Sequence, residues 1–400
     1  MTTPQKLDRI CMVCHGPLSS NSGRHVSSLA KELQLIGWNI VICVPSIDYS
    51  EETTLEGVSI HTFQDFLDAP NSFNCDLYHY WTPREVMRSF HNALCRKFKK
   101  NDIKYVIHYE DDESILLRDQ IKLPQAIDHC LLDMFSNIEI PPHLTHPVHG
   151  RHFAEKASGL TALTSTLLED FSLKSKAVFW PGYDDYFEEI ATNFSLEAAR
   201  CELDIPPNNY IITYIGNTHY SNLEEVRSLY IAVALVNRMG LPLTLIRTGH
   251  DSIPLSSHGM QLLKENVREL GRVSKARLPV LLQLADILVQ PGRDDMWNRK
   301  RVPSKLPEFL VSGRPVVLPR ANLGEILRDG KDAIVLEHAT AASIAETLLK
   351  FLPDQALRDD IGRGGRLFAL EHLQWKKSAN SVVRLYKEII QDSHQHINKP

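Results

Sequence analysis

The sequence predicts an α/β protein built from two doubly wound, Rossmann-like halves. Residues 9–44 run as an apolar strand, a polar loop with glycine, an amphipathic helix and a second apolar strand. That order is a βαβ unit, which implies parallel pairing with a right-handed crossover. The same order restarts near residue 209. Because ligands of open parallel sheets bind at the carboxyl ends of the strands, two such halves are expected to face each other across a cleft.

Composition narrows the class of protein further. The 400 residues are 43% hydrophobic and 23% charged, typical of a globular chain of about two to three domains. The 19 glycines, 22 prolines and 7 cysteines exclude collagen-like, disordered and disulfide-scaffold classes. A net charge of −5 gives no basic field for a nucleic-acid partner. No apolar run approaches the roughly 20 residues that span a bilayer, so we expect a cytoplasmic protein.

The first half is expected to occupy residues 1–190. Leu29, Leu33 and Ile36 recur at helical spacing, and Gly37 ends that helix. The segments CDLYHYW and IKYVIHY then provide two further strands with polar residues at their carboxyl ends. Strand, helix and strand follow again before residue 190.

The second half is expected to occupy residues 209–375, where strands and helices alternate again. Residues 191–208 are polar and contain proline, so they are predicted to be the linker. Residues 376–400 read as a terminal helix with one apolar face.

A basic loop in the second half is the most informative segment. A strand ends at Pro291, and a helix is predicted to begin near Ser304, which would serve as its N-cap. A helix amino terminus carries free N–H groups and a partial positive charge that suit a phosphate. The bland alternative is a solvated basic loop. Four cations surround this helix start: Arg299, Lys300, Arg301 and Lys305.

This block resembles the donor-site signature of GT-B glycosyltransferases, of family 4 in particular. The residues that carry the resemblance are Ala285-Asp286-Ile287, Glu308 and the segment PSKLPEFLVSGRPVV. The resemblance implies the GT-B architecture, a nucleoside diphosphate sugar as donor and no further cofactor. It also implies that Glu308 accepts hydrogen bonds from the ribose hydroxyls, which two carboxylate oxygens suit.

The first half extends the resemblance. HGPLSSNSGRHVSSLAKEL is similar to the family's first glycine-rich loop, with Gly23 at the position of one glycine. YVIHYEDDES corresponds to the strand end where the family keeps a histidine beside the reacting sugar, here His108. A histidine in an apolar segment is more often a packed core residue. Because His108 precedes an acidic loop, we expect it to face the cleft with Glu110 and Asp111 and to orient the transferred sugar and the acceptor.

In the second half, the resemblance assigns further donor contacts. The loop with Gly216 and Asn217 follows the first strand, and the backbone around Arg272 and Val273 would read the base. Arg247 would close the floor of the same pocket. The last helix is similar to the family's terminal helix, which packs back on the first domain.

Two departures from the family pattern affect the phosphate contacts. Lys300 occupies the position of the first of two glutamates, and Asn217, His219 and Asn222 stand where many members carry an Arg or Lys pair. We therefore expect Lys300, Arg301 or Lys305 to neutralise the diphosphate leaving group. No DxD dipeptide ends a strand in the donor half, so the sequence does not require a catalytic metal.

The segment SFHNALCRKFKKNDIK predicts a helix with one apolar and one basic side. Its bland interpretation is a surface helix, and its sharper one is a peripheral contact with an anionic membrane at the inner face. The apolar side carries Phe90, Leu94 and Phe98, and the basic side Arg96, Lys97, Lys99 and Lys100.

Together these features predict a retaining, hexosyltransferase-like enzyme that moves a sugar from a nucleoside diphosphate to a hydroxyl acceptor. The acceptor would be a glycan, a lipid-linked molecule or a small molecule. Retention by front-face attack, with the diphosphate taking the acceptor proton, is implied by the resemblance. The alternatives are a non-catalytic GT-B protein that binds a nucleotide or a partner, and a GT-B sugar-nucleotide epimerase.

Overall fold

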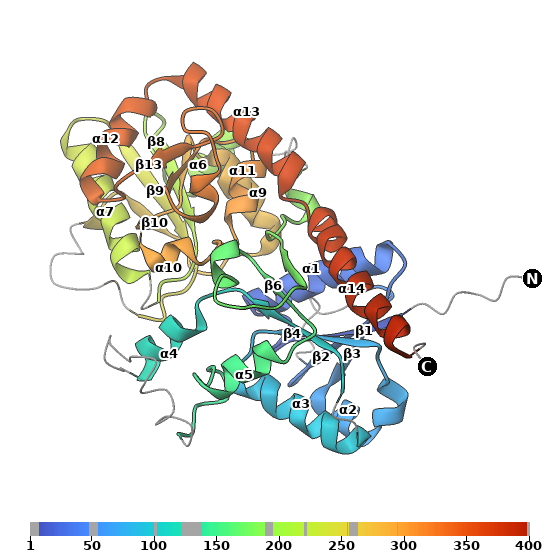
Figure 1. Ribbon diagram of the computed structural model, residues 1–400. Helices are drawn as coiled ribbons and strands as arrows, with labels where there is room; N and C mark the ends of the chain where they lie inside the picture. Colours follow the sequence, from blue (N-terminus) through green and yellow to red (C-terminus); the bar gives the residue numbers. More distant parts are fainter. Residues whose placement is uncertain are drawn as a thin grey trace, which may run out of the picture. The chain divides into compact units, whose positions relative to one another are not determined.

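A computed structural model describes residues 8–47, 55–99, 102–121, 138–188, 195–219, 222–253, 255, 263–293 and 295–397. The chain forms two compact units, one of residues 1–181 with 375–400 and one of residues 182–374. Each unit contains one parallel sheet with helices on both faces (Figure 1). The predicted α/β class with two doubly wound sheets is confirmed.

The first sheet has seven strands in the order β3-β2-β1-β4-β5-β6-β7. The strand order changes direction between β1 and β4, which pair with each other in parallel. Open α/β sheets bind ligands at such switch points. The strands are β1 (Arg9–Val13), β2 (Asn39–Val44), β3 (Ser59–Thr62), β4 (Leu77–Trp81), β5 (Tyr105–Tyr109), β6 (Gly159–Ala162) and β7 (Lys176–Val178).

Helices cover the first sheet on both sides. Residues Phe66, Phe90 and Phe153, from three different helices, pack on the face that carries Cys11 and Tyr80. On the other side, the first and last helices of the chain lie side by side (Figure 1). The helices of this unit are α1 (Asn21–Leu35), α2 (Phe63–Asp68), α3 (Glu85–Phe98), α4 (Glu113–Ile121), α5 (His149–Glu155) and α14 (Trp375–Ile397).

A chain of buried polar side chains joins α14 to the first sheet. The Tyr386 hydroxyl lies 2.7 Å from His79 Nδ1, and His79 Nε2 lies 2.9 Å from the Thr161 hydroxyl. The same hydroxyl lies 2.9 Å from His108 Nδ1. These contacts, with the packing of α14 on α1, place the terminal helix in the first unit.

The buried histidines of the first unit predict acid sensitivity. Burial lowers the pKa of His79 to about 3 and that of His91 to about 4. An unfolded histidine titrates near 6.5, so below that pH the unfolded chain binds more protons than the folded one. The stability from each neutral imidazole is present above pH 6.5 and is lost as the pH falls. We expect each of the two histidines to lower the unfolding free energy by about 2 kcal/mol at pH 5 relative to pH 7. Urea denaturation at the two pH values measures this difference. Equal unfolding free energies at the two pH values would contradict this prediction.

The second sheet has six strands in the order β10-β9-β8-β11-β12-β13. Its strands are β8 (Tyr210–Ile215), β9 (Leu243–Thr248), β10 (Val267–Glu269), β11 (Ile287–Val289), β12 (Val316–Pro319) and β13 (Ile334–Leu336). The helices α7 and α12 pack on one face, and α6 and α9 pack on the other. The helices of this unit are α6 (Leu196–Glu202), α7 (Leu223–Arg238), α9 (Leu278–Leu284), α10 (Met296–Arg299), α11 (Leu306–Val311), α12 (Ala341–Phe351) and α13 (Gln355–His372).

The units divide at residues 181 and 374, whereas the sequence placed the boundaries at 190 and 375. The segment predicted as a linker contributes α6 to the second unit, where Leu203 and Ile205 are buried against Ile211. The apolar side chains of a short polar segment therefore anchor it to the second sheet.

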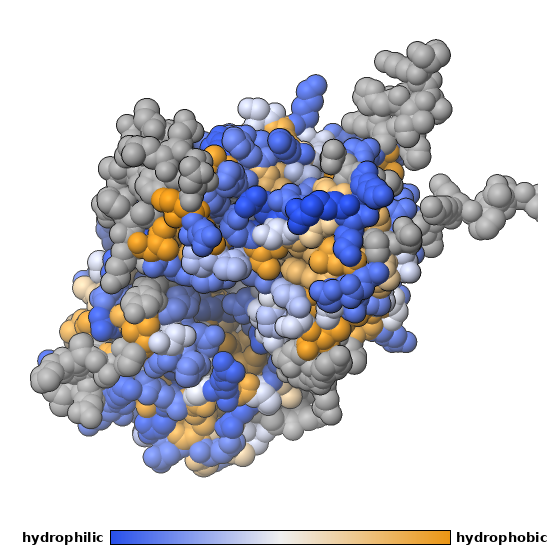
Figure 2. Space-filling view, turned by 90° about the horizontal axis from the view of Figure 1, so that it is seen from below, coloured by the Kyte–Doolittle hydropathy of each residue, from blue (hydrophilic) through white to orange (hydrophobic). Residues whose placement is uncertain are grey.

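None of the described helices is long and apolar enough to cross a membrane. In α3, Phe90 and Leu94 are buried in the core, while Arg96, Lys97 and Lys99 are exposed. Lys100 lies outside the described residues. The apolar side of this helix is thus used for packing, as in an ordinary surface helix. Hydrophilic residues cover most of the face in Figure 2, with hydrophobic ones in separate patches.

Candidate functional site

Two loops at the carboxyl edge of the second sheet are held together as one structure. β8 leads into residues 216–219, and β9 leads into residues 249–251. The Thr218 N–H donates to the His250 carbonyl at 3.0 Å, and the Ser252 N–H donates to the Thr218 carbonyl at 2.9 Å. Gly249 has φ +107°, and a Cβ there would lie 2.3 Å from the Gly216 carbonyl oxygen. The close approach of the two loops therefore requires glycine at position 249.

Asparagine side chains fix the first of these loops from within. Asn217 Oδ1 accepts a hydrogen bond from the His250 N–H at 2.8 Å. The Asn222 side chain donates to the Asn217 carbonyl at 2.9 Å and accepts from the His219 N–H at 2.8 Å. Two of the residues that replace the family's cation pair thus hold the shape of the loop.

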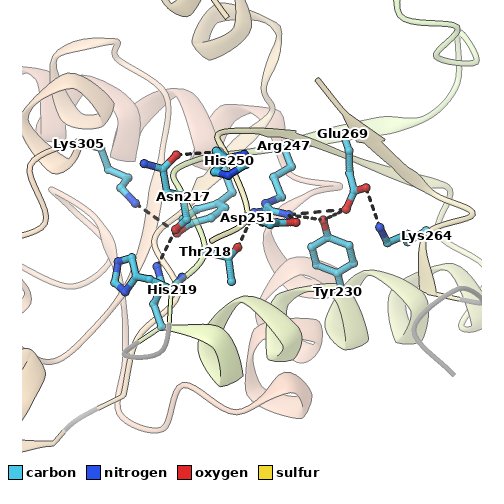
Figure 3. Close-up of polar contacts among 12 residues, drawn as sticks. Asn217, Thr218, His219, Tyr230, Arg247, His250, Asp251, Lys264, Glu269 and Lys305 are labelled. Carbon is cyan, nitrogen blue, oxygen red and sulfur yellow. Dashed lines mark hydrogen bonds and ion pairs between the residues drawn. The ribbon is translucent and has the colours of Figure 1, made fainter. Parts of the chain in front are cut away.

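Arg247, expected on the floor of a nucleotide pocket, is only 3% exposed. Its guanidinium donates to Asp251 and Thr218, and to the Tyr230 hydroxyl at 3.3 Å (Figure 3). Although burial opposes it, the hydrogen bonds with Asp251 and Tyr230 raise the pKa of Arg247. Arg247 therefore supports both loops from below through its contacts with Thr218 and Asp251.

Lys305 directs its ammonium group at the first loop. The Nζ atom lies 4.5 Å from the centre of the Tyr214 ring and 3.3 Å from the Tyr214 hydroxyl. A Cβ built on Gly216 would lie 2.5 Å from this Nζ. The lack of a side chain at position 216 therefore leaves room for the ammonium group at the carboxyl end of β8.

The electrostatics of this edge favour an anion. Desolvation and the nearby charges of Arg301 and Lys305 lower the pKa of His219 to about 4. Burial is the larger cause of this shift, and the positive charges of Arg301 and Lys305 add to it. Residues of the loop and the basic segment thus meet at one edge of the second sheet.

Arg301 contributes to this positive charge but is held by internal partners. Its guanidinium donates to Asn298 Oδ1 at 2.9 Å and lies 3.4 Å from the buried Glu225 carboxylate. It also lies 5.3 Å from the centre of the Trp297 ring. Burial raises the pKa of Glu225, opposed by Arg301 and Asn298. Of the expected cations, Lys305 is the one that the described contacts bring against Gly216.

The predicted Ser304 cap is wrong. Helix α11 begins at Leu306, its N-cap is Lys305, and no side chain caps it. With Ser304 as N-cap, the third helical residue would be Pro307, which has no N–H to donate, and the second would be Leu306, whose N–H donates to the Pro303 carbonyl at 3.0 Å. Ser304 lies instead in the preceding turn, and Glu308 is half-buried in the first turn of the helix.

Of the remaining predicted donor residues, Arg272 and Val273 lie in a segment that is hydrogen-bonded to the second loop, whereas Gly23 lies in the first unit. Arg272 is exposed and Val273 half-buried, both just after β10. The Gly249 N–H donates to the Gly271 carbonyl at 2.8 Å, which ties their segment to the second loop. Gly23 lies in the first turn of α1, where a Cβ would be 2.4 Å from the Pro17 carbonyl oxygen. The close contact between α1 and the loop before it therefore requires glycine at position 23.

In the first unit, the expectation that His108 is open at a strand end is wrong. Its side chain is fully buried, its ring is stacked on Phe179 at 4.8 Å, and the Trp81 ring lies 4.1 Å away. Burial lowers its pKa well below the ordinary value. Successive side chains of a strand point to opposite faces of the sheet. At its position in β5, the His108 side chain points to the buried face, where the rings of Trp81 and Phe179 lie.

Glu110, in contrast, lies at the carboxyl edge of the first sheet in a dense polar cluster. Its Oε1 lies 2.7 Å from His25 Nδ1 and 2.7 Å from Trp81 Nε1, and its Oε2 accepts from the Ser22 hydroxyl. Although burial opposes ionisation, the contacts with His25 and Ser22 lower the pKa of Glu110. Sequence reasoning missed Ser22 and His25, whose spacing of three on a helix was the available signal.

A second polar cluster surrounds Arg84, whose charge interacts with that of Glu110. Arg84 Nε lies 3.1 Å from Glu113 Oε2, and Arg84 Nη1 lies 2.8 Å from His15 Nε2. The Thr145 hydroxyl donates to the same Glu113 carboxylate at 2.6 Å. Asp111 is half-buried beside this cluster, and its charge contributes to the raised pKa of Arg84, which burial opposes.

The backbone is strained at the same edge. Thr82, directly after β4, is fully buried and has φ +80°, which is rare for a β-branched residue. Among the described residues, its hydroxyl has no hydrogen-bond partner. Such backbone outliers persist only where their surroundings impose them, and they concentrate at functional sites.

Comparisons by sequence and by structure relate the chain to known proteins. Residues 209–354 match the family model described as Glycosyl transferases group 1. D-inositol 3-phosphate glycosyltransferase of Salinispora arenicola is 24% identical over 204 residues, which cover 48% of this chain and 44% of that relative. The matched region thus spans less than half of the curated relative's length.

Solved structures match over more of the chain. Sucrose-phosphate synthase from Thermosynechococcus elongatus aligns with a TM-score of 0.67 at 14% identity, covering 96% of this chain and 100% of that one. Anabaena HepE in complex with UDP aligns with a TM-score of 0.69 at 14% identity, covering 95% and 100%.

The chain has the GT-B fold, with two α/β units that each contain one parallel sheet. The family match covers residues 209–354, which lie in the second unit. The narrower assignment to family 4 stays a prediction.

Proposed function

We propose that this protein is a retaining glycosyltransferase that moves a sugar from a nucleoside diphosphate to a hydroxyl group. The observation that carries the proposal is the position of the Lys305 ammonium group beside Gly216 at the carboxyl end of β8. A cation at a glycine-lined strand end suits a diphosphate, whose charge grows as the sugar leaves.

The second unit would bind the donor. Glu308 lies three residues after Lys305, in the first turn of α11, so the ribose and the diphosphate would be bound by neighbouring groups. UDP-sugars are the first donors to test, because HepE structures contain UDP and UDP-glucose. The first unit would supply the groups that meet the acceptor, from the polar cluster around Glu110 at the edge of its sheet and from Asp111 beside it.

The Glu308→Gln variant tests the ribose contact. We expect the KM for the donor to rise about 10- to 100-fold, because hydrogen bonds to a charged group contribute about 1.5–3 kcal/mol. The measurement is release of nucleoside diphosphate from UDP-glucose, UDP-N-acetylglucosamine, GDP-mannose and ADP-glucose, with glucose, glycerol and myo-inositol as acceptors.

Glu346→Gln is the matched control, because Glu346 is exposed on α12 and carries the same change of charge. It should leave the KM unchanged. Equal donor KM values for Glu308→Gln and the wild type would overturn the assigned role of Glu308.

A second candidate is a non-catalytic protein that binds a nucleotide. It is favoured by the internal ion pairs of Arg247 and Arg301, which leave fewer cations for the diphosphate. Calorimetric binding of UDP without turnover of any donor in the panel would support this alternative.

A further inference from the structure

Both oxygens of the Glu110 carboxylate accept hydrogen bonds from protein groups. Oε1 is shared by His25 and Trp81 at 2.7 Å each, and Oε2 accepts from the Ser22 hydroxyl. The residue is only 9% exposed. A carboxylate occupied in this way is poorly placed to bind the acceptor directly, which is the role that the sequence suggests for Glu110.

The same contacts define how His25 presents its ring. An ionised carboxylate only accepts hydrogen bonds, so His25 must carry a hydrogen on Nδ1. In the neutral imidazole the lone pair is then on Nε2. The carboxylate thus orients the imidazole as an aspartate does in a serine hydrolase triad.

His25 is also held in place by its surroundings. The ring lies 5.4 Å from the Trp375 ring, and 9% of its side chain is exposed. It lies in the first turns of α1, which follow the carboxyl end of β1. Trp81, which shares Glu110 with His25, precedes the strained Thr82 at the end of the neighbouring strand β4.

We propose that His25 is the group of the first unit that accepts a hydrogen bond from the acceptor hydroxyl, through Nε2. Glu110 is then a positioning residue that acts through His25. This inference rests on the proposed transferase function and extends it to a residue to which the sequence analysis gave no role.

Two variants of His25 separate a substrate contact from a structural contact. His25→Asn keeps a side-chain N–H near the position of Nδ1, so it retains the bond to Glu110 and lacks the atom at Nε2. His25→Gln places an amide oxygen near the position of Nε2 and gives up the bond to Glu110. We expect His25→Asn to lower kcat by about 10²-fold and His25→Gln to keep more of the activity. The donor KM should change by less than about twofold in both variants.

The experiment uses the full chain with the donor and hydroxyl acceptor from the panel above that give the fastest turnover. His91→Asn is the matched control, because His91 is 8% exposed in the same unit and bonds to the Tyr80 hydroxyl at 3.1 Å. This control should keep the wild-type kcat. Thermal unfolding of each variant identifies any loss of folded protein.

A double variant tests the role of Glu110. If Glu110 acts through His25, Glu110→Gln in the His25→Asn background should lower kcat no further than His25→Asn alone. Full activity of His25→Asn, or a loss confined to His25→Gln, would overturn this inference while the transferase function stands. Absence of turnover by the wild type with every donor and acceptor would overturn the proposed function itself.

Discussion

Replacing Lys305 by alanine is expected to lower kcat/KM for the nucleotide-sugar donor by about 10²- to 10³-fold. The ammonium group lies beside Gly216 and over the Tyr214 ring, where it would neutralise the departing diphosphate. Removing one fixed donor to a developing charge typically has an effect of this size. Binding of UDP, measured by calorimetry, should weaken in the same variant because the charge also contacts the ground state.

The Lys350→Ala variant provides the comparison. Lys350 is exposed near the end of α12, and its replacement removes the same charge from the same unit. Its kinetics should match the wild type, which would exclude a general effect of net charge. If Lys305→Ala kept the wild-type kcat/KM, the assignment of the diphosphate site to this edge of the second sheet would fail.

Replacing Gly249 by alanine is expected to have the next largest effect. The new Cβ would lie 2.3 Å from the Gly216 carbonyl oxygen, and the residue has φ +107°. We expect a loss of roughly 3 kcal/mol in unfolding free energy, the sum of backbone strain and displacement of the neighbouring loop. Because Gly216 moves, activity of the remaining folded protein should fall as well.

The Gly240→Ala variant isolates the cost of the backbone conformation. Gly240 has φ +88°, but a Cβ there meets nothing within 4 Å. It should lose only about 1 kcal/mol and keep the wild-type kcat/KM. The free energies of unfolding come from urea denaturation of the three proteins. Equal losses for the two variants would mean that the contact between the two loops contributes nothing.

Local patterns in the sequence were sufficient for the architecture. The strands around Cys11 and Ile211 and the helices between them follow from apolar periodicity and glycine-containing loops, and both sheets are present as expected. The segment around Glu308 was likewise recognisable, because its residue types and spacing lie within one short stretch. The Ser304 cap was wrong, since Pro307 has no N–H and the Leu306 N–H donates to the Pro303 carbonyl.

The partners of the polar side chains were beyond the reach of local patterns. Glu110 meets His25 across 85 positions of sequence, and Arg301 meets Glu225 across 76. Such pairs depend on which strands are neighbours in the sheet and on the register between them. His108 illustrates the same limit, because a shift of one residue in a strand moves a side chain to the opposite face.

The sequence by itself therefore determined the two doubly wound sheets, the glycine-containing loops at their edges and the position of Lys305 and Glu308 within one segment. Only the tertiary structure decided that Arg247 and Arg301 are held by internal carboxylates, that Lys305 faces Gly216, and that Glu110 is joined to His25. The physical reason is that hydrophobic periodicity is a property of neighbouring residues, whereas the hydrogen-bond partner of a buried charge depends on side chains that folding brings together from distant strands.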